Sequence, residues 1–207
     1  MIRVAFCGPR ASGKSTLARH LWHTYEVPRY ALARPIKQII AEAPRDQYQR
    51  HLWLWDWSRI LFPDASDVLR ARFVTEVNAA FREEKDPGRL AQRIGSIGRH
   101  LDEQVWIRYL LAHLPVGHAV VEDVRFANEV AALRREGFVL IRLQAPAEVL
   151  AERISRRGDD HRDPRHESEH SLPDGPYDAE WNTAEALEIT LSRLDKLVER
   201  LSQRAAG

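Results

Sequence analysis

A phosphate-binding loop constrains this chain more than any other stretch of its sequence. Residues 8–15 read Gly-Pro-Arg-Ala-Ser-Gly-Lys-Ser and fit the pattern G-x-x-x-x-G-K-[ST] at every fixed position. The apolar residues 2–7 before it predict a buried β-strand, and the helical spacing of Leu17 and Leu21 after it predicts a helix. The motif therefore has the strand–loop–helix context that it requires, and it predicts a site for a nucleotide triphosphate.

The residue types of this loop suit a polyphosphate with its metal. Glycines let successive backbone N–H groups point inward at phosphate oxygens, and the N-terminus of the following helix adds partial positive charge. Lys14 is predicted to reach the β- and γ-phosphates, and the Ser15 hydroxyl to ligate Mg²⁺. A chance match in a glycine turn is the alternative. The predicted nucleotide-binding residues are Gly8, Pro9, Arg10, Ala11, Ser12, Gly13, Lys14, Ser15 and Thr16.

Length and composition exclude several classes of protein. The chain has 207 residues, which suits one domain with a sizeable core. Its 31 Lys and Arg residues against 30 Asp and Glu residues give a net charge of +1, which argues against a nucleic-acid partner. No apolar run is long enough to span a bilayer, and residues 2–7 are too few for a signal peptide. The single cysteine, Cys7, excludes an intramolecular disulfide. We therefore expect a cytoplasmic protein without membrane or nucleic-acid partners.

Two basic segments in the first half are candidate anion sites. Residues 27–32 predict a short strand, after which Arg34 and Lys37 lie near the N-terminus of a predicted helix. A solvated basic pair is an equal alternative there. Further on, residues 95–98 (Gly-Ser-Ile-Gly) interrupt a helical pattern just before Arg99. A flexible or close-packed backbone next to an arginine suits a site that clamps an anion.

A tryptophan-rich stretch lies between these two segments. Trp53 and Trp57 are four residues apart, which would place them on one helical face, whereas the alternation of Trp53, Trp55 and Trp57 suits a strand equally well. The helix-forming residues around them favour a helix. Packing is the favoured role for these rings, and stacking on a nucleobase is the alternative.

The clearest strand after the first covers residues 118–123 and ends in two acids, Glu122 and Asp123. An acid at the end of a parallel strand beside a phosphate loop commonly holds Mg²⁺ or its water, or takes a proton from the acceptor. Asp123 and Arg125 are therefore candidates for one site. The alternative is that Asp123 only caps a helix predicted over residues 126–136.

Arginines and a charged stretch follow in the last third of the chain. A predicted helix ends with Arg153, Arg156 and Arg157, and residues 159–170 contain almost no apolar side chain, so they cannot form core. We interpret the segment as a lid whose arginines stabilise charge on a transferring phosphoryl group. A plain exposed loop is the alternative.

The C-terminal segment predicts an amphipathic helix over residues 184–205, after a short strand over residues 177–181. Packing of the helix on the sheet is the favoured interpretation, and a coiled-coil homodimer is the alternative. The apolar stripe is formed by Leu187, Leu191, Leu194, Val198 and Leu201.

Four blocks of this sequence resemble the phage-type deoxynucleoside monophosphate kinases, which are P-loop NMP-kinase-like proteins. The blocks cover residues 8–16, residues 92–99 with Val105-Trp106, residues 121–129 (Val-Glu-Asp-Val-Arg-Phe-Ala-Asn-Glu), and residues 167–172 (Glu-Ser-Glu-His-Ser-Leu). Together they span nearly the whole chain, and the third and fourth are the more specific. Two departures stand out: the glycine block is one residue tighter before Arg99, and Ala127 stands where the family has proline.

The resemblance implies an α/β P-loop kinase fold, a parallel five-stranded sheet flanked by helices, with an NMP-binding region and a lid. We expect a single domain over residues 1–207, with a helical acceptor-binding insertion over residues 33–114 and a lid over residues 153–172. The reaction it implies belongs to deoxynucleotide metabolism. It moves the γ-phosphate of ATP, with Mg²⁺, to a deoxynucleoside monophosphate and gives ADP and a deoxynucleoside diphosphate.

Each predicted role falls on named residues. The predicted catalytic residues are Lys14, Asp123, Arg125, Arg153 and Arg157, and the predicted metal ligands are Ser15 and Asp123. The predicted substrate-binding residues are Arg34, Lys37, Arg99, Trp106 and Arg125. Rival interpretations are another small-molecule P-loop kinase, acting on phosphomevalonate or dephospho-coenzyme A, and a non-metabolic NTPase.

Overall fold

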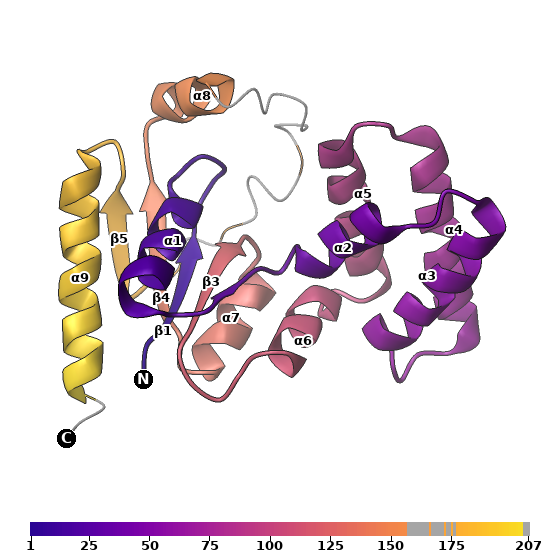
Figure 1. Cartoon of the computed structure of the whole chain (residues 1–207), viewed down its shortest axis with the longest axis horizontal. Helices are drawn as coiled ribbons and strands as arrows, with labels where there is room; N and C mark the ends of the chain where they lie inside the picture. Colours follow the sequence, from indigo (N-terminus) through magenta and orange to yellow (C-terminus); the bar gives the residue numbers. More distant parts are fainter. Residues whose placement is uncertain (157–165, 167–171, 173–174, 176, 205–207) are drawn as a thin grey trace. The chain divides into compact units, whose positions relative to one another are not determined.

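The computed structural model describes residues 1–156, 166, 172, 175 and 177–204, and it divides into two compact units. The first is an α/β unit whose described parts are residues 1–31, 113–156 and 177–204, with the isolated residues 166, 172 and 175. The second is a helical unit of residues 32–112. Figure 1 labels their helices and strands along the chain.

The α/β unit is built on a five-stranded parallel sheet in the order β2-β3-β1-β4-β5. Its central strand β1 pairs with β3 on one side and with β4 on the other. The connection from β3 to β4 therefore passes over β1, in the direction opposite to the connection from β1 to β2. Such a crossing is the point where open α/β sheets bind ligands, at the carboxyl ends of the strands. The predicted fold class is confirmed. The strands are β1 (Arg3–Cys7), β2 (Arg29–Tyr30), β3 (Ala119–Val124), β4 (Val139–Gln144) and β5 (Ala179–Asn182).

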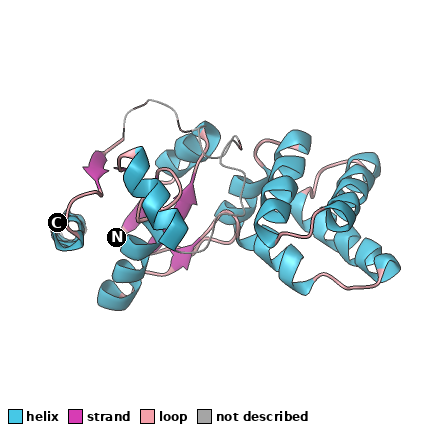
Figure 2. Ribbon diagram, turned by 90° about the horizontal axis from the view of Figure 1, so that it is seen from above, coloured by secondary structure: helices cyan, strands magenta, loops and turns pink. Residues whose placement is uncertain are grey.

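Helices cover this sheet because a parallel sheet must bury both faces. Alternate residues of β1 point to opposite faces, and Val4 and Phe6 join a core with side chains of α1 and α9. Buried Val130 and Leu133 of α7 lie outside that core cluster. Figure 2 shows the strands flanked by helices in this unit and helices alone in the other. The helices of this unit are α1 (Lys14–Tyr25), α7 (Ala127–Arg135), α8 (Ala147–Arg156) and α9 (Leu187–Arg204).

The last helix packs inside its own unit. Leu194 and Val198 are buried in the core that contains Leu17 and Leu21 of α1, because their stripe faces that helix and the sheet. This centre of the stripe is therefore not exposed for a coiled coil, whereas Leu187 at its start is 48% exposed. No helix within the described ranges is long and apolar enough to cross a membrane.

The helical unit begins each of its three longest helices with an acidic or hydroxyl side chain. Asp46, Ser66 and Asp86 accept hydrogen bonds from backbone N–H groups in the first turns of α3, α4 and α5, which satisfies donors that a helix leaves unpaired. The tryptophan-rich stretch is helical, and Trp53 and Trp57 pack edge to face at 6.0 Å. The elements are α2 (Arg34–Glu42), α3 (Gln47–Leu61), α4 (Asp67–Glu83), α5 (Pro87–Leu101) and α6 (Val105–Ala112).

The predicted interruption at residues 95–98 is wrong, because α5 runs through these residues without a break. Its glycines serve close packing. A Cβ on Gly98 would lie 2.3 Å from Cζ2 of Trp106, so only a residue without a side chain leaves room for the indole. The indole Nε1–H donates a 2.9 Å hydrogen bond to the Gly95 carbonyl, which ties α6 to α5.

Candidate functional site

The phosphate loop joins the end of β1 to the start of α1, as its motif predicts. Gly8 has a φ of 142°, and a Cβ there would lie 2.3 Å from the Leu143 carbonyl oxygen of β4. Glycine is therefore required where the loop leaves the sheet. The loop then turns back into the helix, and the Gly13 carbonyl accepts bonds from the N–H groups of Thr16 and Leu17.

Lys14 lies with its ammonium group on the loop itself. Nζ donates to the Gly8 carbonyl at 2.7 Å, the Pro9 carbonyl at 2.6 Å and the Ser12 hydroxyl at 3.4 Å. The residue is 7% exposed, so these oxygens replace the water that a buried charge loses. Anionic phosphate oxygens are stronger partners for an ammonium than neutral carbonyls. The loop thus holds a cation where it can exchange carbonyls for phosphate. Ser15 is exposed beside it.

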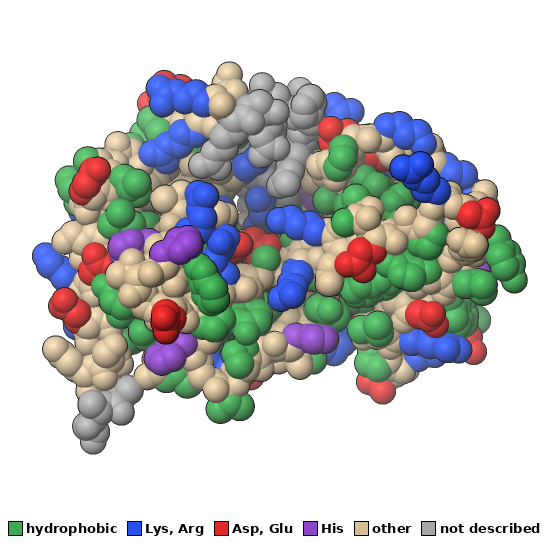
Figure 3. Space-filling view, viewed as in Figure 1, with side chains coloured by type: hydrophobic (Ala, Val, Ile, Leu, Met, Phe, Trp, Pro, Cys, Tyr) green, Lys and Arg blue, Asp and Glu red, His purple; other side chains and the backbone are tan. Residues whose placement is uncertain are grey.

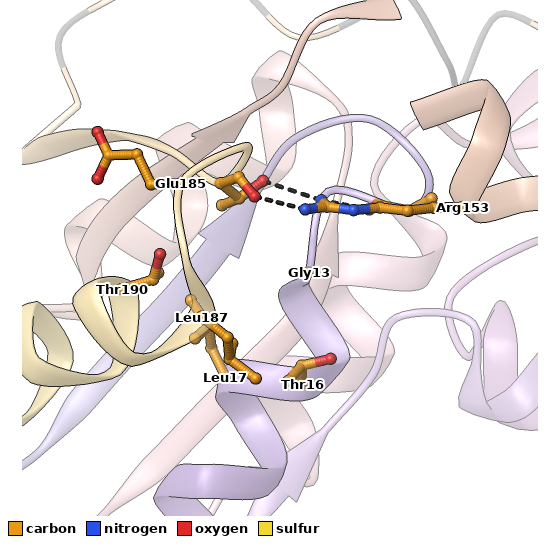
Figure 4. A pocket seen from close by; sticks show the side chains of 9 residues that line it. Gly13, Thr16, Leu17, Arg153, Glu185, Leu187 and Thr190 are labelled. Atoms are coloured by element: carbon orange, nitrogen blue, oxygen red, sulfur yellow. Dashed lines mark hydrogen bonds between the residues drawn. The ribbon is translucent and has the colours of Figure 1, made fainter. Parts of the chain in front are cut away.

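A pocket of about 230 Å³ opens beside the loop within the α/β unit. Its walls come from the phosphate loop and the first turn of α1, and from Arg153 on α8. The remaining wall is formed by the segment between β5 and α9 and by the first turn of α9 (Figure 4). The lining combines an apolar wall with hydroxyl groups, a guanidinium and a carboxylate, a mixture that is common in small-molecule sites. The lining residues are Ala11, Gly13, Thr16, Leu17, Arg153, Thr183, Glu185, Leu187 and Thr190.

Arg153 bridges two walls of this pocket. Its Nη1 donates to the Ala11 carbonyl and to the Thr183 hydroxyl, both at 3.3 Å, and its Nη2 donates to the Thr183 carbonyl at 2.5 Å (Figure 4). The Thr183 N–H and hydroxyl both donate to the Gln144 carbonyl, at 2.8 and 3.1 Å. The guanidinium therefore fixes the spacing between the phosphate loop and the turn after β5.

The rest of the predicted lid is described only in part. Arg157 and residues 159–165 and 167–170 lie outside the described residues, as does most of the fourth resemblance block. Arg156 is exposed and pairs with Glu152 of its own helix at 2.6 Å. Of the two helix-end arginines that the structure describes, Arg153 contacts the Ala11 carbonyl of the phosphate loop.

The two acids at the end of β3 have different surroundings. Glu122 pairs with Arg29 of β2, whose Nη2 lies 3.0 and 2.9 Å from the two carboxylate oxygens. Asp123 is half-buried within β3, and the register pairs the next residue, Val124, with Cys7 at the end of β1. Asp123 thus stands at the level where the phosphate loop begins, and Arg125 follows in the connection to α7.

The N-cap position of α7 belongs to Phe126 and not to Asp123. The helix begins after Phe126, and the capping carboxylate belongs to Glu129. Its Oε2 accepts hydrogen bonds from the N–H groups of Arg125 at 2.8 Å and Phe126 at 3.0 Å. Sequence reasoning missed this residue, although a glutamate three residues into a helix is the known signal of a capping box.

Burial keeps the cysteine at the end of β1 neutral. Removal from water raises the pKa of the Cys7 thiol to about 12; the Lys14 charge lowers it and the Glu129 charge raises it. A thiol with this pKa is unreactive, which agrees with a packing role.

In the helical unit, α2 and α5 meet at Gly95. A Cβ on Gly95 would lie 3.4 Å from Cδ1 of Ile36 and 3.6 Å from Nη1 of Arg99. Arg99 therefore lies near the helix that carries Arg34 and Lys37, whose side chains are exposed. These three predicted phosphate ligands belong to one pair of packed helices.

The predicted substrate contact of Trp106 is not supported. The residue is 2% exposed and its ring fills the space that Gly98 leaves, so it holds α5 and α6 together. Sequence spacing placed Trp106 near Arg99 but did not reveal which way the indole faces.

The donor set around the loop fits Mg²⁺. Among the described residues no three His, Cys, Asp or Glu side chains gather into a metal cage. Mg²⁺ commonly takes one or two protein oxygens and completes its shell with phosphates and water. The Ser15 hydroxyl and the Asp123 carboxylate supply such oxygens.

Figure 3 shows acidic and basic side chains interspersed on the face that it displays, in keeping with the net charge of +1.

Comparisons with known proteins agree with a nucleotide-binding chain. A family model described as an AAA domain matches residues 4–174. No curated protein matches the chain.

Solved structures resemble the chain only remotely. An unliganded sugar kinase from Janibacter sp. HTCC2649 is 14% identical and aligns over 96% of this chain and 95% of its own, with a TM-score of 0.47. Shikimate kinase from Aquifex aeolicus vf5 is 14% identical over 100% and 99%, with a TM-score of 0.43. TT1252 from Thermus thermophilus is 19% identical over 100% and 98%, with a TM-score of 0.44.

Proposed function

We propose, from the premise that this chain belongs to the AAA domain family, that it is an ATP-dependent kinase of deoxynucleoside monophosphates. The observation that carries the kinase part is the geometry of Lys14, a buried ammonium held by the carbonyls of a phosphate loop beside a pocket. The deoxynucleotide part rests on the four resemblance blocks, above all on residues 121–129.

The donor nucleotide would bind in the α/β unit. Its β- and γ-phosphates would lie on the loop amides and Lys14, and its base would enter the pocket beside Arg153. Mg²⁺, when bound, would be held by Ser15 and by Asp123 directly or through water, and would neutralise charge on the β- and γ-phosphate oxygens. Arg153 would keep the loop and the turn after β5 at the spacing that the base requires.

The acceptor would be bound by cationic side chains. Arg125, which follows the strand that carries Asp123, is the candidate within the α/β unit, and the roles of Arg34, Lys37 and Arg99 in the helical unit stay predictions from the sequence. A monophosphate acceptor is already an anionic nucleophile, so the chain needs no strong general base. Positioning the two phosphates in line and neutralising their charge supply the rate.

An acceptor panel tests this proposal. We would measure ADP release in a coupled assay with ATP, Mg²⁺ and each deoxynucleoside and ribonucleoside monophosphate, together with phosphomevalonate, dephospho-coenzyme A, shikimate and simple sugars. The highest kcat/KM is expected for a deoxynucleoside monophosphate. Turnover confined to any other acceptor, or ATP hydrolysis stimulated by nucleic acid without acceptor phosphorylation, would overturn it.

A further inference from the structure

A single buried oxygen holds the backbone that carries the candidate acceptor residues. Glu129 is 4% exposed in the first turn of α7, and its Oε2 accepts both the Arg125 N–H and the Phe126 N–H. A carboxylate is expensive to remove from water unless donors surround it. One oxygen with two backbone donors is such an arrangement, and it sits at the connection between β3 and α7.

This connection is short, so fixing its amides fixes its side chains. Only Arg125 and Phe126 separate the end of β3 at Val124 from the start of α7 at Ala127. A backbone whose consecutive N–H groups are bound to one atom cannot rotate freely at either residue. The direction in which Arg125 projects therefore depends on the position of the Glu129 carboxyl group.

The connection that Glu129 holds also lies beside the start of the phosphate loop. Val124, the residue before Arg125, pairs with Cys7 in the sheet, and Cys7 is the last residue before the loop. The connection and the loop therefore leave neighbouring strands at the same level of the sheet.

We propose that Glu129 is a positioning residue for acceptor binding, which acts by accepting the Arg125 and Phe126 hydrogen bonds with one oxygen. This inference rests on the proposed function. Its role is to hold an acceptor oxygen at that distance from the backbone of the β3–α7 connection. Glu129 does not touch the acceptor itself.

Two substitutions separate the position of the Glu129 oxygen from the charge of its side chain. Glu129→Gln keeps an oxygen at the same distance and removes the charge, whereas Glu129→Asp keeps the charge and withdraws the oxygen by one methylene. We expect Glu129→Gln to keep an acceptor KM close to that of the native chain. We expect Glu129→Asp to raise it by about tenfold, with the KM for ATP nearly unchanged.

Asp178→Ala is the control for the loss of a carboxylate that binds a backbone N–H away from the site. Asp178 is exposed and accepts the Leu140 N–H at 2.8 Å near the amino end of β4, away from the phosphate loop. This variant should leave the acceptor KM unchanged. An equal rise in acceptor KM in both variants would reduce the role of Glu129 to general stability and overturn the proposal.

Two further readouts complete the experiment. Arg125→Ala combined with Glu129→Asp should raise the acceptor KM little beyond Arg125→Ala alone, because both act through one side chain. Hydrogen exchange of peptides from residues 119–130, measured without substrates, should be faster in Glu129→Asp and unchanged in Glu129→Gln. A native chain that phosphorylates no nucleotide would refute the proposed function, and the exchange result would still report on Glu129. Loss of acceptor affinity in Glu129→Gln but not in Glu129→Asp would refute the positioning role.

Discussion

Replacing Arg153 with methionine tests the architecture of the nucleotide pocket most directly. Methionine keeps most of the length and packing of the side chain and removes all of its donors. The change deletes the bonds to the Ala11 carbonyl, the Thr183 hydroxyl and the Thr183 carbonyl. The phosphate loop and the turn after β5 then lose the bridge that sets their spacing.

The size of the effect follows from the shortest of these bonds. The bonds to the Ala11 carbonyl and to the Thr183 hydroxyl are long, at 3.3 Å, so we assign them little of the binding free energy. The 2.5 Å bond to the Thr183 carbonyl is charge-assisted, a class worth about 1.5–3 kcal/mol. Because the Arg153 side chain is partly exposed, we take the lower end, about 1.5 kcal/mol, which corresponds to about a tenfold loss of affinity.

The assay is steady-state kinetics with each substrate varied in turn. We expect Arg153→Met to raise the KM for ATP by about tenfold and to leave the acceptor KM unchanged. The matched control is Arg156→Met, which removes an exposed arginine of the same helix whose partner is Glu152, and which should change neither value. A large fall in kcat at an unchanged KM for ATP would refute this reasoning, since Arg153 would then meet the transferring phosphoryl group.

Three further outcomes are expected. Lys14→Ala should abolish turnover, to below a few per cent, with unchanged circular dichroism; residual turnover above that level would exclude this loop as the catalytic one. Asp123→Asn should melt near the native temperature, lower kcat by about a hundredfold and raise the Mg²⁺ requirement; near-native turnover at low Mg²⁺ would remove Asp123 from the site. Burial tends to raise the pKa of Asp195, but hydrogen bonds from His20 at 2.6 Å and Tyr25 at 2.8 Å outweigh it and lower that pKa. Asp195 therefore stabilises the fold above its unfolded pKa of about 3.9 and loses this contribution as pH falls through the folded value, so Asp195→Asn should flatten the stability profile of chemical denaturation below about pH 4. A profile unchanged by the substitution would contradict this assignment.

Local patterns in the sequence determined the backbone of this protein and the position of its phosphate loop. The fixed residues of the motif place Gly8 and Lys14 correctly because each depends on its neighbours along the chain. The helix around Trp53 was predictable from the helix-forming residues on either side of it, and the buried stripe at Leu194 from its helical period. The strand that carries Asp123 was predictable from its apolar run.

Only the tertiary structure decided which partners the polar and aromatic side chains find. The sequence analysis grouped Trp106 with Arg99 as a substrate-binding residue, but packing against Gly98 buries its indole. Glu129 binds the backbone before α7, although only Asp123 had been considered for a place at this helix start. Arg153 reaches the Thr183 carbonyl, 30 residues further along the chain. Periodicity records which face a residue occupies, whereas a hydrogen-bond partner depends on elements that folding brings together from distant parts of the chain.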